Sequence, residues 1–241
     1  MMYLDRDSHV HTNFSQDADP NASFQAYIDE AQRKGITQIT FTDHIDFDAA
    51  HPLFQTPINY DEYIASFNEV KQHTTFDMKL GVEIGYQSHT KDRINQFLTQ
   101  YPFEFVILSV HYVEKKDLYT KEYFQGKTKK EAYDTYFKLC LEAINNTPNF
   151  TVFGHLDYIS RYSPFGDYEY QDYKEIIDEI LQALINRNKG IEINTSGLKH
   201  EGRTYPCTQV INRYKELGGT ILSYGSDAHN ITELGVKQLD I

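Results

Sequence analysis

Histidine recurs in this chain at the points where short apolar runs end. Five segments show the pattern: Ser8-His9-Val10-His11, Thr42-Asp43-His44, Ser109-Val110-His111, Gly154-His155 and Ser226-Asp227-Ala228-His229. Two further acids accompany them, Asp17 in the loop after the first segment and Glu83 inside another apolar run. Imidazole nitrogens and carboxylate oxygens together are ligands that bind transition metals. The pattern predicts that the fold gathers these side chains into one metal-binding pocket.

Two of the segments place ligand-type residues two positions apart. His9 and His11 close one apolar run, and Asp227 and His229 close another. On a strand, such residues point to the same face, so each pair could reach one ion. Taken alone, a pair of this kind more often lies at the surface or in the core without binding a metal. A single histidine such as His111 is more often hydrogen-bonded in the core. The segments together favour the metal interpretation, because all of them would lie at strand ends.

Glu83 is the most informative single residue. It lies within the apolar run Gly81-Val82-Glu83-Ile84-Gly85, where a carboxylate is costly unless it is paired or bound to a metal. A carboxylate can also bridge two cations. Of the neighbours Asp43 and His44, we expect His44 to face the pocket, while Asp43 caps a turn or supports a ligand from behind.

The candidate ligands are too many for one ion and suit two or three. They are His9, His11, Asp17, His44, Glu83, His111, His155, Asp227 and His229. Ions that lie close together hold an attacking hydroxide and stabilise the leaving oxygen of a displacement at phosphorus. The chain has no Gly-x-Ser-x-Gly elbow, no P-loop and no Gly-x-Gly-x-x-Gly motif, so acyl transfer and a nucleotide cradle lack support. Metal-dependent phosphoester hydrolysis is the predicted activity.

A phosphate also needs a fixed cation beside the metal ions. Arg161 follows His155 by six residues, and Lys199 and Arg203 follow the sixth predicted strand. Arginine can bind a phosphate through two nitrogens, whereas lysine acts as a point charge. These three residues are the candidate substrate contacts, although each is also compatible with a solvated loop cation. Arg161 is the one we expect to stabilise the phosphoryl oxygens during catalysis.

The other histidines do not follow strand ends, and we expect them at the surface: His51, His73, His89 and His200. Of these, His89 and His200 are candidates for the pocket rim. Cys140 lies on the apolar face of a predicted helix, where a buried, inert thiol is expected. The chain has two cysteines and no Cys-x-x-Cys pair, and its first residues do not resemble a signal peptide. These features favour a reducing cytoplasm.

Strands and helices are expected to alternate along the whole chain. Apolar or β-branched runs predict strands at residues 3–10, 36–42, 79–84, 103–110, 151–154, 190–195 and 220–224. Helical periodicity fills the intervals, and Thr128 with Glu131 forms a plausible capping box for one helix. Alternation of this kind is typical of parallel strands joined by crossover helices. We expect one α/β barrel formed by residues 1–241, with its active site at the C-terminal ends of the strands.

Composition restricts the partners. The chain has 241 residues and a formal net charge of −12, which would repel phosphate backbones and anionic lipid. We therefore expect neither nucleic acid nor a membrane as a partner. No apolar run approaches the roughly 20 residues of a membrane span. Bound cations would offset part of the negative charge.

The histidine and acid motifs resemble, in order and spacing, those of the polymerase-and-histidinol-phosphatase (PHP) superfamily. Four further segments are similar to its histidinol-phosphatase branch: Gly81-Val82-Glu83-Ile84-Gly85-Tyr86, Gly154-His155-Leu156-Asp157-Tyr158-Ile159-Ser160-Arg161-Tyr162, Glu192-Ile193-Asn194-Thr195-Ser196-Gly197-Leu198 and Tyr224-Gly225-Ser226-Asp227-Ala228-His229. The resemblance covers nearly the whole chain. It implies a distorted seven-stranded (β/α) TIM-like barrel with three divalent transition-metal ions, for which zinc, iron and manganese are the candidates.

The resemblance also implies ligand sets and a reaction. The ions would be held by three sets of residues: His9, His11, Glu83 and Asp227; Glu83, His111 and His155; and Asp17, His44 and His229. The implied reaction is hydrolysis of L-histidinol phosphate to L-histidinol and phosphate, a step of histidine biosynthesis, with Asp17 or His229 as candidate acid for the leaving group. Lys199 occupies a position where the resemblance leads us to expect arginine.

Two alternatives stay open at the level of sequence. One is the same barrel acting on another small phosphoester or a nucleotide. The other is a metal-bound scaffold without turnover, although such a scaffold usually goes with lost ligands, and here every ligand position carries a ligating side chain. The sequence does not decide the oligomeric state.

Overall fold

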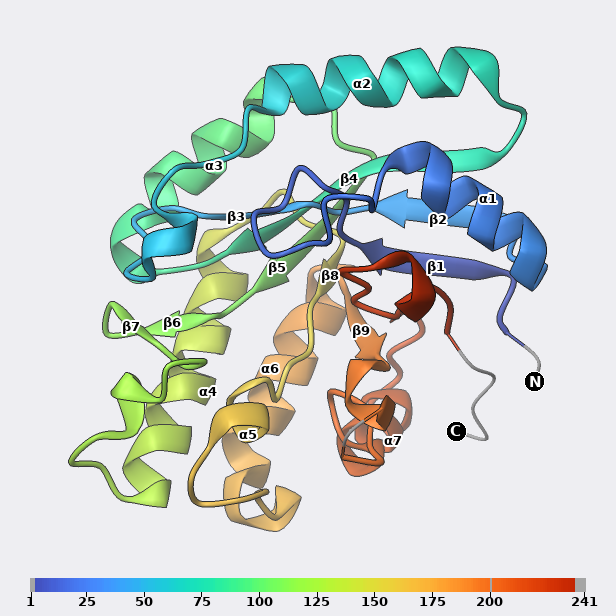
Figure 1. Cartoon of the computed structure of the whole chain (residues 1–241). Coiled ribbons are helices and arrows are strands. Elements are labelled where there is room, and N and C mark those ends of the chain that lie inside the picture. Colours follow the sequence, from blue (N-terminus) through green and yellow to red (C-terminus); the bar gives the residue numbers. More distant parts are fainter. Residues whose placement is uncertain (1–2, 200, 237–241) are drawn as a thin grey trace.

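The computed structural model describes residues 3–199 and 201–236. Its centre is a sheet of parallel strands in the spatial order β1-β2-β4-β5-β8-β9-β10 (Figure 1). The bounds are β1 Arg6–Val10, β2 Gln38–Phe41, β4 Asp77–Gly85, β5 Phe105–Ser109, β8 Val152–Phe153, β9 Gly190–Asn194 and β10 Leu222–Gly225. All seven predicted strands are present, and they follow one another around the sheet in chain order.

The first and last of these strands approach each other and nearly close the sheet into a barrel. Val10 at the end of β1 forms a parallel bridge with Ala228. The backbone N–H of His11 donates to the Ala228 carbonyl at 2.9 Å, and that of Asp227 donates to the His9 carbonyl at 2.9 Å. The expected α/β barrel of seven strands is confirmed.

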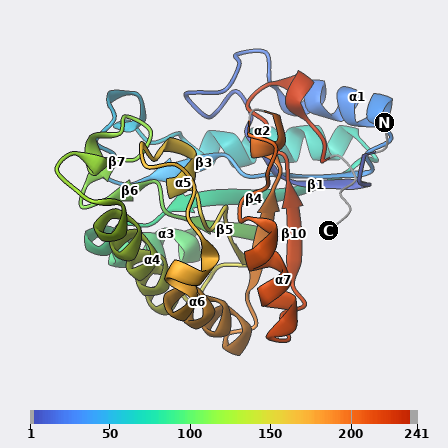
Figure 2. The same ribbon diagram turned by 90° about the horizontal axis from the view of Figure 1, so that it is seen from below.

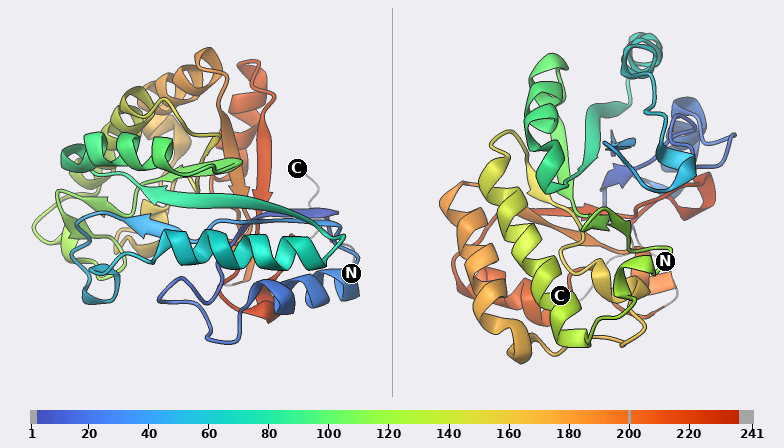
Figure 3. Two further views of the ribbon diagram at one scale, coloured as in Figure 1. Left: turned by 90° about the horizontal axis from the view of Figure 1, so that it is seen from above. Right: turned by 90° about the vertical axis from the view of Figure 1, so that its left-hand side faces the viewer.

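Helices cover the outside of the barrel (Figures 2 and 3). Their bounds are α1 Phe24–Lys34, α2 Tyr60–His73, α3 Lys91–Gln100, α4 Lys129–Asn146, α5 Ile159–Tyr162, α6 Lys174–Asn186 and α7 Thr208–Glu216. Each long helix buries an apolar face, because its hydrophobic residues recur with helical periodicity. Thr128 and Glu131 form the expected capping box at the start of α4, and Cys140 on this helix is fully buried. No helix in the described part of the chain is long and apolar enough to cross a membrane.

Two features near the barrel mouth depart from expectation. The expected second strand is followed, after Thr42 and Asp43, by a further short strand, β3 (His44–Asp46). This strand pairs with the C-terminal half of β4. β2 and β3 pair with β4 in the same register, so Thr42 and Asp43 interrupt the strand without changing its direction. After the expected strand at residues 103–110, the chain forms a hairpin of β6 (Tyr112–Val113) and β7 (Lys116–Asp117), which the sequence did not predict.

Candidate metal centre

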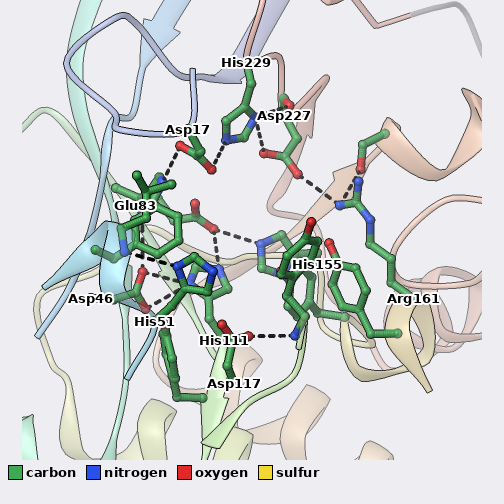
Figure 4. Close-up of a pocket in the computed structure, with 18 of the residues that line it drawn as sticks. Asp17, Asp46, His51, Glu83, His111, Asp117, His155, Arg161, Asp227 and His229 are labelled. Atoms are coloured by element: carbon green, nitrogen blue, oxygen red, sulfur yellow. Dashed lines mark hydrogen bonds and ion pairs between the residues drawn. The ribbon is translucent and has the colours of Figure 1, made fainter. Parts of the chain in front are cut away.

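A cavity of about 440 Å³ lies at the C-terminal ends of the strands, and it is lined by histidines and acids (Figure 4). Seven of the candidate ligands line it: Asp17, His44, Glu83, His111, His155, Asp227 and His229. The other two, His9 and His11, are fully buried beneath it and face Glu83 and Asp227. The fold therefore brings all nine side chains together.

Glu83 is the central residue of the group. Its Oε1 atom lies 2.8 Å from His155 Nε2 and 3.3 Å from His111 Nε2. Its Oε2 atom lies 3.3 Å from His9 Nε2 and 3.6 Å from His11 Nε2. Burial opposes ionisation of the carboxyl group, but the surrounding histidines outweigh this effect and hold the pKa of Glu83 well below its usual range. One carboxylate is thus positioned to serve two neighbouring ions.

Asp227 completes the set around the first two histidines. Its Oδ1 atom lies 3.5 Å from His9 Nε2 and 3.3 Å from His11 Nε2, while the two Nε2 atoms lie 2.9 Å apart. Two imidazole nitrogens that face each other beside two carboxylates match the donor set of a shared divalent cation. Asp227 has a positive φ of 56°, a conformation that aspartate tolerates in turns.

Asp17 joins a third group near the cavity rim. Its two oxygens lie 3.0 Å from His44 Nε2 and 3.2 Å from His229 Nε2. Figure 4 shows Asp17 and His229 facing one another across the upper part of the cavity. Burial disfavours the charged form of His44, but hydrogen bonds to Asp17 and Asp46 raise its pKa to about 10. This group also has the composition of a metal site.

The ligand atoms cluster closely enough to bind ions. Within each of three groups, these atoms lie within 4.8 Å of one another: His9, His11 and Glu83; Glu83, His111 and His155; and His11, His44 and His229. The second group is a set expected from the resemblance, and the first is such a set without Asp227. The third contains His11 where Asp17 was expected, but Asp17 contacts the other two histidines of the same group. The residues fit two or three divalent transition-metal ions by donor type and spacing.

Asp43 supports the centre from behind, as the sequence suggested. It is buried, and its Oδ1 atom accepts hydrogen bonds from the backbone N–H groups of Thr12 at 2.8 Å and Ser15 at 3.1 Å. The Ser15 hydroxyl also donates to Asp43 and lies 3.4 Å from His11 Nδ1. Asp43 therefore stabilises the turn that follows the first two histidines.

Sequence reasoning missed two further buried carboxylates. Asp46 Oδ1 lies 3.0 Å from His111 Nδ1, and Glu192 Oε1 lies 2.5 Å from His9 Nδ1. Glu192 was detectable, because it lies within an apolar strand just as Glu83 does. Asp46 carried no such signal, because it follows the apolar run of β2 in what reads as a loop.

Two of the candidate phosphate contacts reach the cavity. Arg161 lines it, and its Nη1 atom lies 3.4 Å from Ser196 Oγ and 3.6 Å from Asp227 Oδ2. Lys199 also lines it, with its Nζ atom 3.5 Å from Glu233 Oε2. Both cations therefore lie on the side of the cavity that carries Asp227.

Arg203 is placed differently from the expectation. It is not among the residues that line the cavity. Its guanidinium pairs with the fully buried Asp157 and lies 2.6 Å from Asp167. Two carboxylates thus pair with the Arg203 guanidinium. This pairing favours a structural role for Arg203 over contact with the substrate.

The remaining histidines fall in several places. His51 is half-buried and lines the cavity, a position that the sequence did not predict. His89 does not line it and instead lies 3.4 Å from Asp48. His73 ends α2, and His200 lies outside the described residues.

Comparison with known families identifies the fold and the motifs. Residues 7–196 match the PHP domain. This chain belongs to the PHP domain family. Over 228 residues it is 34% identical to a histidinol-phosphatase of Lactococcus lactis subsp. lactis (strain IL1403), an alignment that covers 92% of this chain and 83% of that protein.

Two solved structures share this fold. The crystal structure of histidinol phosphate phosphatase from Lactococcus lactis, complexed with zinc, L-histidinol and phosphate, superimposes with a TM-score of 0.84 at 34% identity. The match covers 94% of this chain and 86% of that one. A structure from Listeria monocytogenes has a TM-score of 0.81 at 19% identity, covers 95% of this chain and 97% of that one, and shows the fold alone.

Proposed function

We propose that this PHP domain protein hydrolyses L-histidinol phosphate to L-histidinol and phosphate with three divalent transition-metal ions. The observation that carries the proposal is the convergence of Glu83 and eight other ligand-type side chains in one pocket. Its similarity to an enzyme whose crystal structure contains zinc, L-histidinol and phosphate supports the same substrate. Zinc, iron and manganese all suit a donor set of imidazoles and carboxylates.

The metal-holding roles follow the contacts described above. His9, His11 and Asp227 would hold one ion together with Glu83, which would also serve the ion at His111 and His155. The third ion would lie among the side chains Asp17, His44 and His229. Divalent cations held in this way would supply Lewis acidity and an activated water for attack on phosphorus.

The protein's own groups complete the reaction. The Arg161 guanidinium would bind phosphoryl oxygens through two nitrogens, and Lys199 would add a point charge at the same end of the cavity. The leaving alkoxide needs a proton, and the attacking water gives one up. Asp17 and His229, the candidate acids, would pass this proton to the alkoxide. Their side chains are 33% and 28% exposed, which makes them accessible to a substrate at the mouth. We do not include Arg203 among the substrate contacts, because carboxylates already engage it.

The part of the cavity around Asp117 suits the amine and imidazole of L-histidinol. Asp117 lines it with a carboxylate that is 6% exposed and accepts a hydrogen bond from the Tyr119 N–H at 2.7 Å. The rings of His51, Tyr119 and Tyr162 line the same cavity. A buried acid beside aromatic rings is a suitable site for a cationic, ring-bearing group. We propose that Asp117 binds the ammonium or imidazole group of the substrate.

Location, domain organisation and partners form part of the same proposal. We infer a cytoplasmic enzyme, supported by two free cysteines, Cys140 and Cys207. The net charge of −12 supports a small anionic substrate bound at a local cationic site and disfavours nucleic acid. We also infer that residues 1–241 form a single domain.

Phosphate release from L-histidinol phosphate tests the proposal. Protein loaded with zinc or manganese should release phosphate from this substrate faster than from p-nitrophenyl phosphate or nucleoside monophosphates. Absence of release, or a preference for another phosphoester, would contradict the substrate assignment.

Glu83→Ala tests whether the centre is catalytic. Because Glu83 contacts four candidate ligand histidines, we expect the variant to lose bound metal and to lower kcat/KM by more than about 100-fold. Elemental analysis and phosphate release are the two measurements. If the wild-type protein shows no turnover and the variant loses only metal and stability, the result would instead support a scaffold.

A further inference from the structure

In each of the two histidines that flank Glu83, the two ring nitrogens face different groups. The Nε2 atoms of His9 and His111 each lie 3.3 Å from a Glu83 oxygen. Their Nδ1 atoms face two buried carboxylates that are not among the nine candidate ligands: Glu192 lies 2.5 Å from His9, and Asp46 lies 3.0 Å from His111. On each side of Glu83, an acid thus contacts a histidine from behind.

Glu192 contacts the ends of two strands at once. It is fully buried in β9, and its Oε2 atom accepts a hydrogen bond from the backbone N–H of His155 at 2.9 Å. Its Oε1 atom contacts the ring of His9. A carboxylate without solvent contact is unfavourable unless its oxygens are hydrogen-bonded. Both Glu192 oxygens therefore have a partner, and one of these partners is a ligand histidine.

Asp46 contacts two histidines that belong to different ion positions. It ends β3 and is 7% exposed. Its oxygens lie 3.0 Å and 3.2 Å from His111 Nδ1, and Oδ2 also lies 3.4 Å from His44 Nδ1. The short strand β3, which pairs with β4, brings this acid beside the end of β5.

Two glycines provide the space for these acids. A Cβ atom at Gly225 would overlap Glu192 Oε1 and the Cβ of His9. A Cβ atom at Gly85 would overlap the Asp46 carboxylate. Neither glycine has a positive φ, so space and not backbone conformation requires glycine at both positions. The two arrangements thus depend on a glycine at the end of a neighbouring strand.

We propose that Glu192 and Asp46 are positioning residues that hold the Nδ1–H groups of His9 and His111 and direct their Nε2 lone pairs to the metal ions. A neutral imidazole carries one proton, and an acceptor at Nδ1 keeps that proton away from Nε2. Asp46 does the same for His44. The proposal rests on the metal centre proposed above, and it adds two carboxylates to the residues on which metal affinity depends.

Zinc affinity of Glu192→Gln tests the first half of the proposal. Both Glu192 oxygens face N–H donors, so an amide must turn its NH₂ toward either His9 or the His155 backbone. If it faces His9, the ring proton moves to Nε2 and the metal ligand is lost. We expect zinc affinity, measured by equilibrium dialysis against buffered free zinc, to fall about 10–100-fold at one site. Asp46→Asn should have a similar effect, because an amide oxygen cannot serve both of its histidines.

Asp7→Asn is the matched control. Asp7 is also fully buried, lies on the same strand as His9, and accepts backbone hydrogen bonds from Ser226 at 2.9 Å, Gly235 at 2.8 Å and His9 at 3.4 Å, but does not contact a ligand ring. The asparagine amide would also place its N–H donors against other N–H donors, but these belong to the backbone and not to a histidine ring. We expect reduced thermal stability and wild-type zinc affinity. Equal zinc loss in the control and in Glu192→Gln would overturn the positioning role.

Nitrogen-15 NMR of the zinc-loaded wild-type protein tests the same point without a variant that must fold. We expect His9 and His111 to carry a proton on Nδ1 and to bind zinc through Nε2. An unprotonated Nδ1 on either ring would overturn the proposal for that residue, as would undiminished zinc affinity in a Glu192→Gln protein whose His9 proton has moved to Nε2. These measurements use zinc alone, so they remain decisive even if L-histidinol phosphate is not hydrolysed.

Discussion

Arg161 brings a positive charge to the edge of the metal centre, 3.6 Å from Asp227 and 3.4 Å from the Ser196 hydroxyl. We expect Arg161→Ala to lower kcat/KM for L-histidinol phosphate by about 100-fold, because a fixed donor to the developing phosphoryl charge is lost. Arg161→Lys should recover only part of this, since lysine lacks the two-nitrogen geometry. Steady-state kinetics measure the effect. Metal content should be unchanged in both variants, and its loss would indicate a structural role.

Asp117 should determine which phosphoester is preferred. We expect Asp117→Asn to lower kcat/KM for L-histidinol phosphate about 10-fold, mainly through KM, because a hydrogen bond from a cationic group to a carboxylate is weakened. An asparagine oxygen can still accept the Tyr119 N–H, so the local turn is preserved. Hydrolysis of p-nitrophenyl phosphate, which lacks an amine and an imidazole, is the control. An equal loss with both substrates would argue against recognition by Asp117.

The type and position of a residue in the sequence identified the candidate ligands more readily than the carboxylates that support them. Glu83 was conspicuous because a carboxylate inside an apolar run is unfavourable without a partner. The same reasoning would have identified Glu192, which also lies in an apolar strand. Asp46 and Asp157 could not be recognised, because their partners lie far away in sequence and only the folded barrel brings them together. The carboxylate partners of Arg203 are likewise distant in sequence.

At the scale of elements, Asp178 connects α6 to α7. It accepts hydrogen bonds from Arg213 Nε at 2.9 Å and Nη2 at 2.8 Å, and from the Tyr170 hydroxyl at 2.6 Å. The bond from Arg213 lowers the pKa of Asp178 well below its usual range, although partial burial opposes this. Since the folded pKa is depressed, the stabilisation is present above the unfolded pKa, near 4, and is lost as pH falls toward the folded value.

We expect Asp178→Asn to lower the free energy of unfolding by about 1–2 kcal/mol at pH 7. The difference from wild type should persist down to about pH 4 and narrow below it. Urea denaturation across this range provides the measurement. Asp134→Asn is the control, because Asp134 pairs with the exposed Lys130 on the same helix and should contribute less than about 0.5 kcal/mol. A difference that did not change with pH would contradict the role of the charge.

The regular elements could be predicted because long apolar runs and helical periodicity are local signals. The pieces β3, β6 and β7 have only two or three residues, which is too short for a pattern to emerge. Their pairing depends on tertiary context: β3 exists because the nine-residue β4 extends beyond β2 and offers it a partner. The acid that this short strand carries, Asp46, was missed together with it.

At the scale of the whole molecule, the metal centre lies across the seam that closes the barrel. Val10 at the end of β1 forms an isolated bridge with Ala228, three residues beyond β10, whereas β9 and β10 pair over four residues. His9 and His11 extend from one side of this seam, and Asp227 extends from the other. Ions held among them would connect the first and last strands. Metal binding is therefore expected to contribute to barrel closure as well as to chemistry.

Metal removal should consequently loosen the seam before the rest of the sheet. We expect a chelator to lower the melting temperature, since a ligand present at 100 times its Kd stabilises the fold by about 2.7 kcal/mol per site. Hydrogen exchange should accelerate most at the amides of His11 and Asp227, which bond across the seam at 2.9 Å. Amides between β4 and β5 are the internal control, because five consecutive residue pairs join those strands independently of the seam. Mass spectrometry of exchanging protein, with and without chelator, measures both regions. Equal acceleration in the two regions would mean that the ions stabilise the barrel as a whole and do not specifically join its ends.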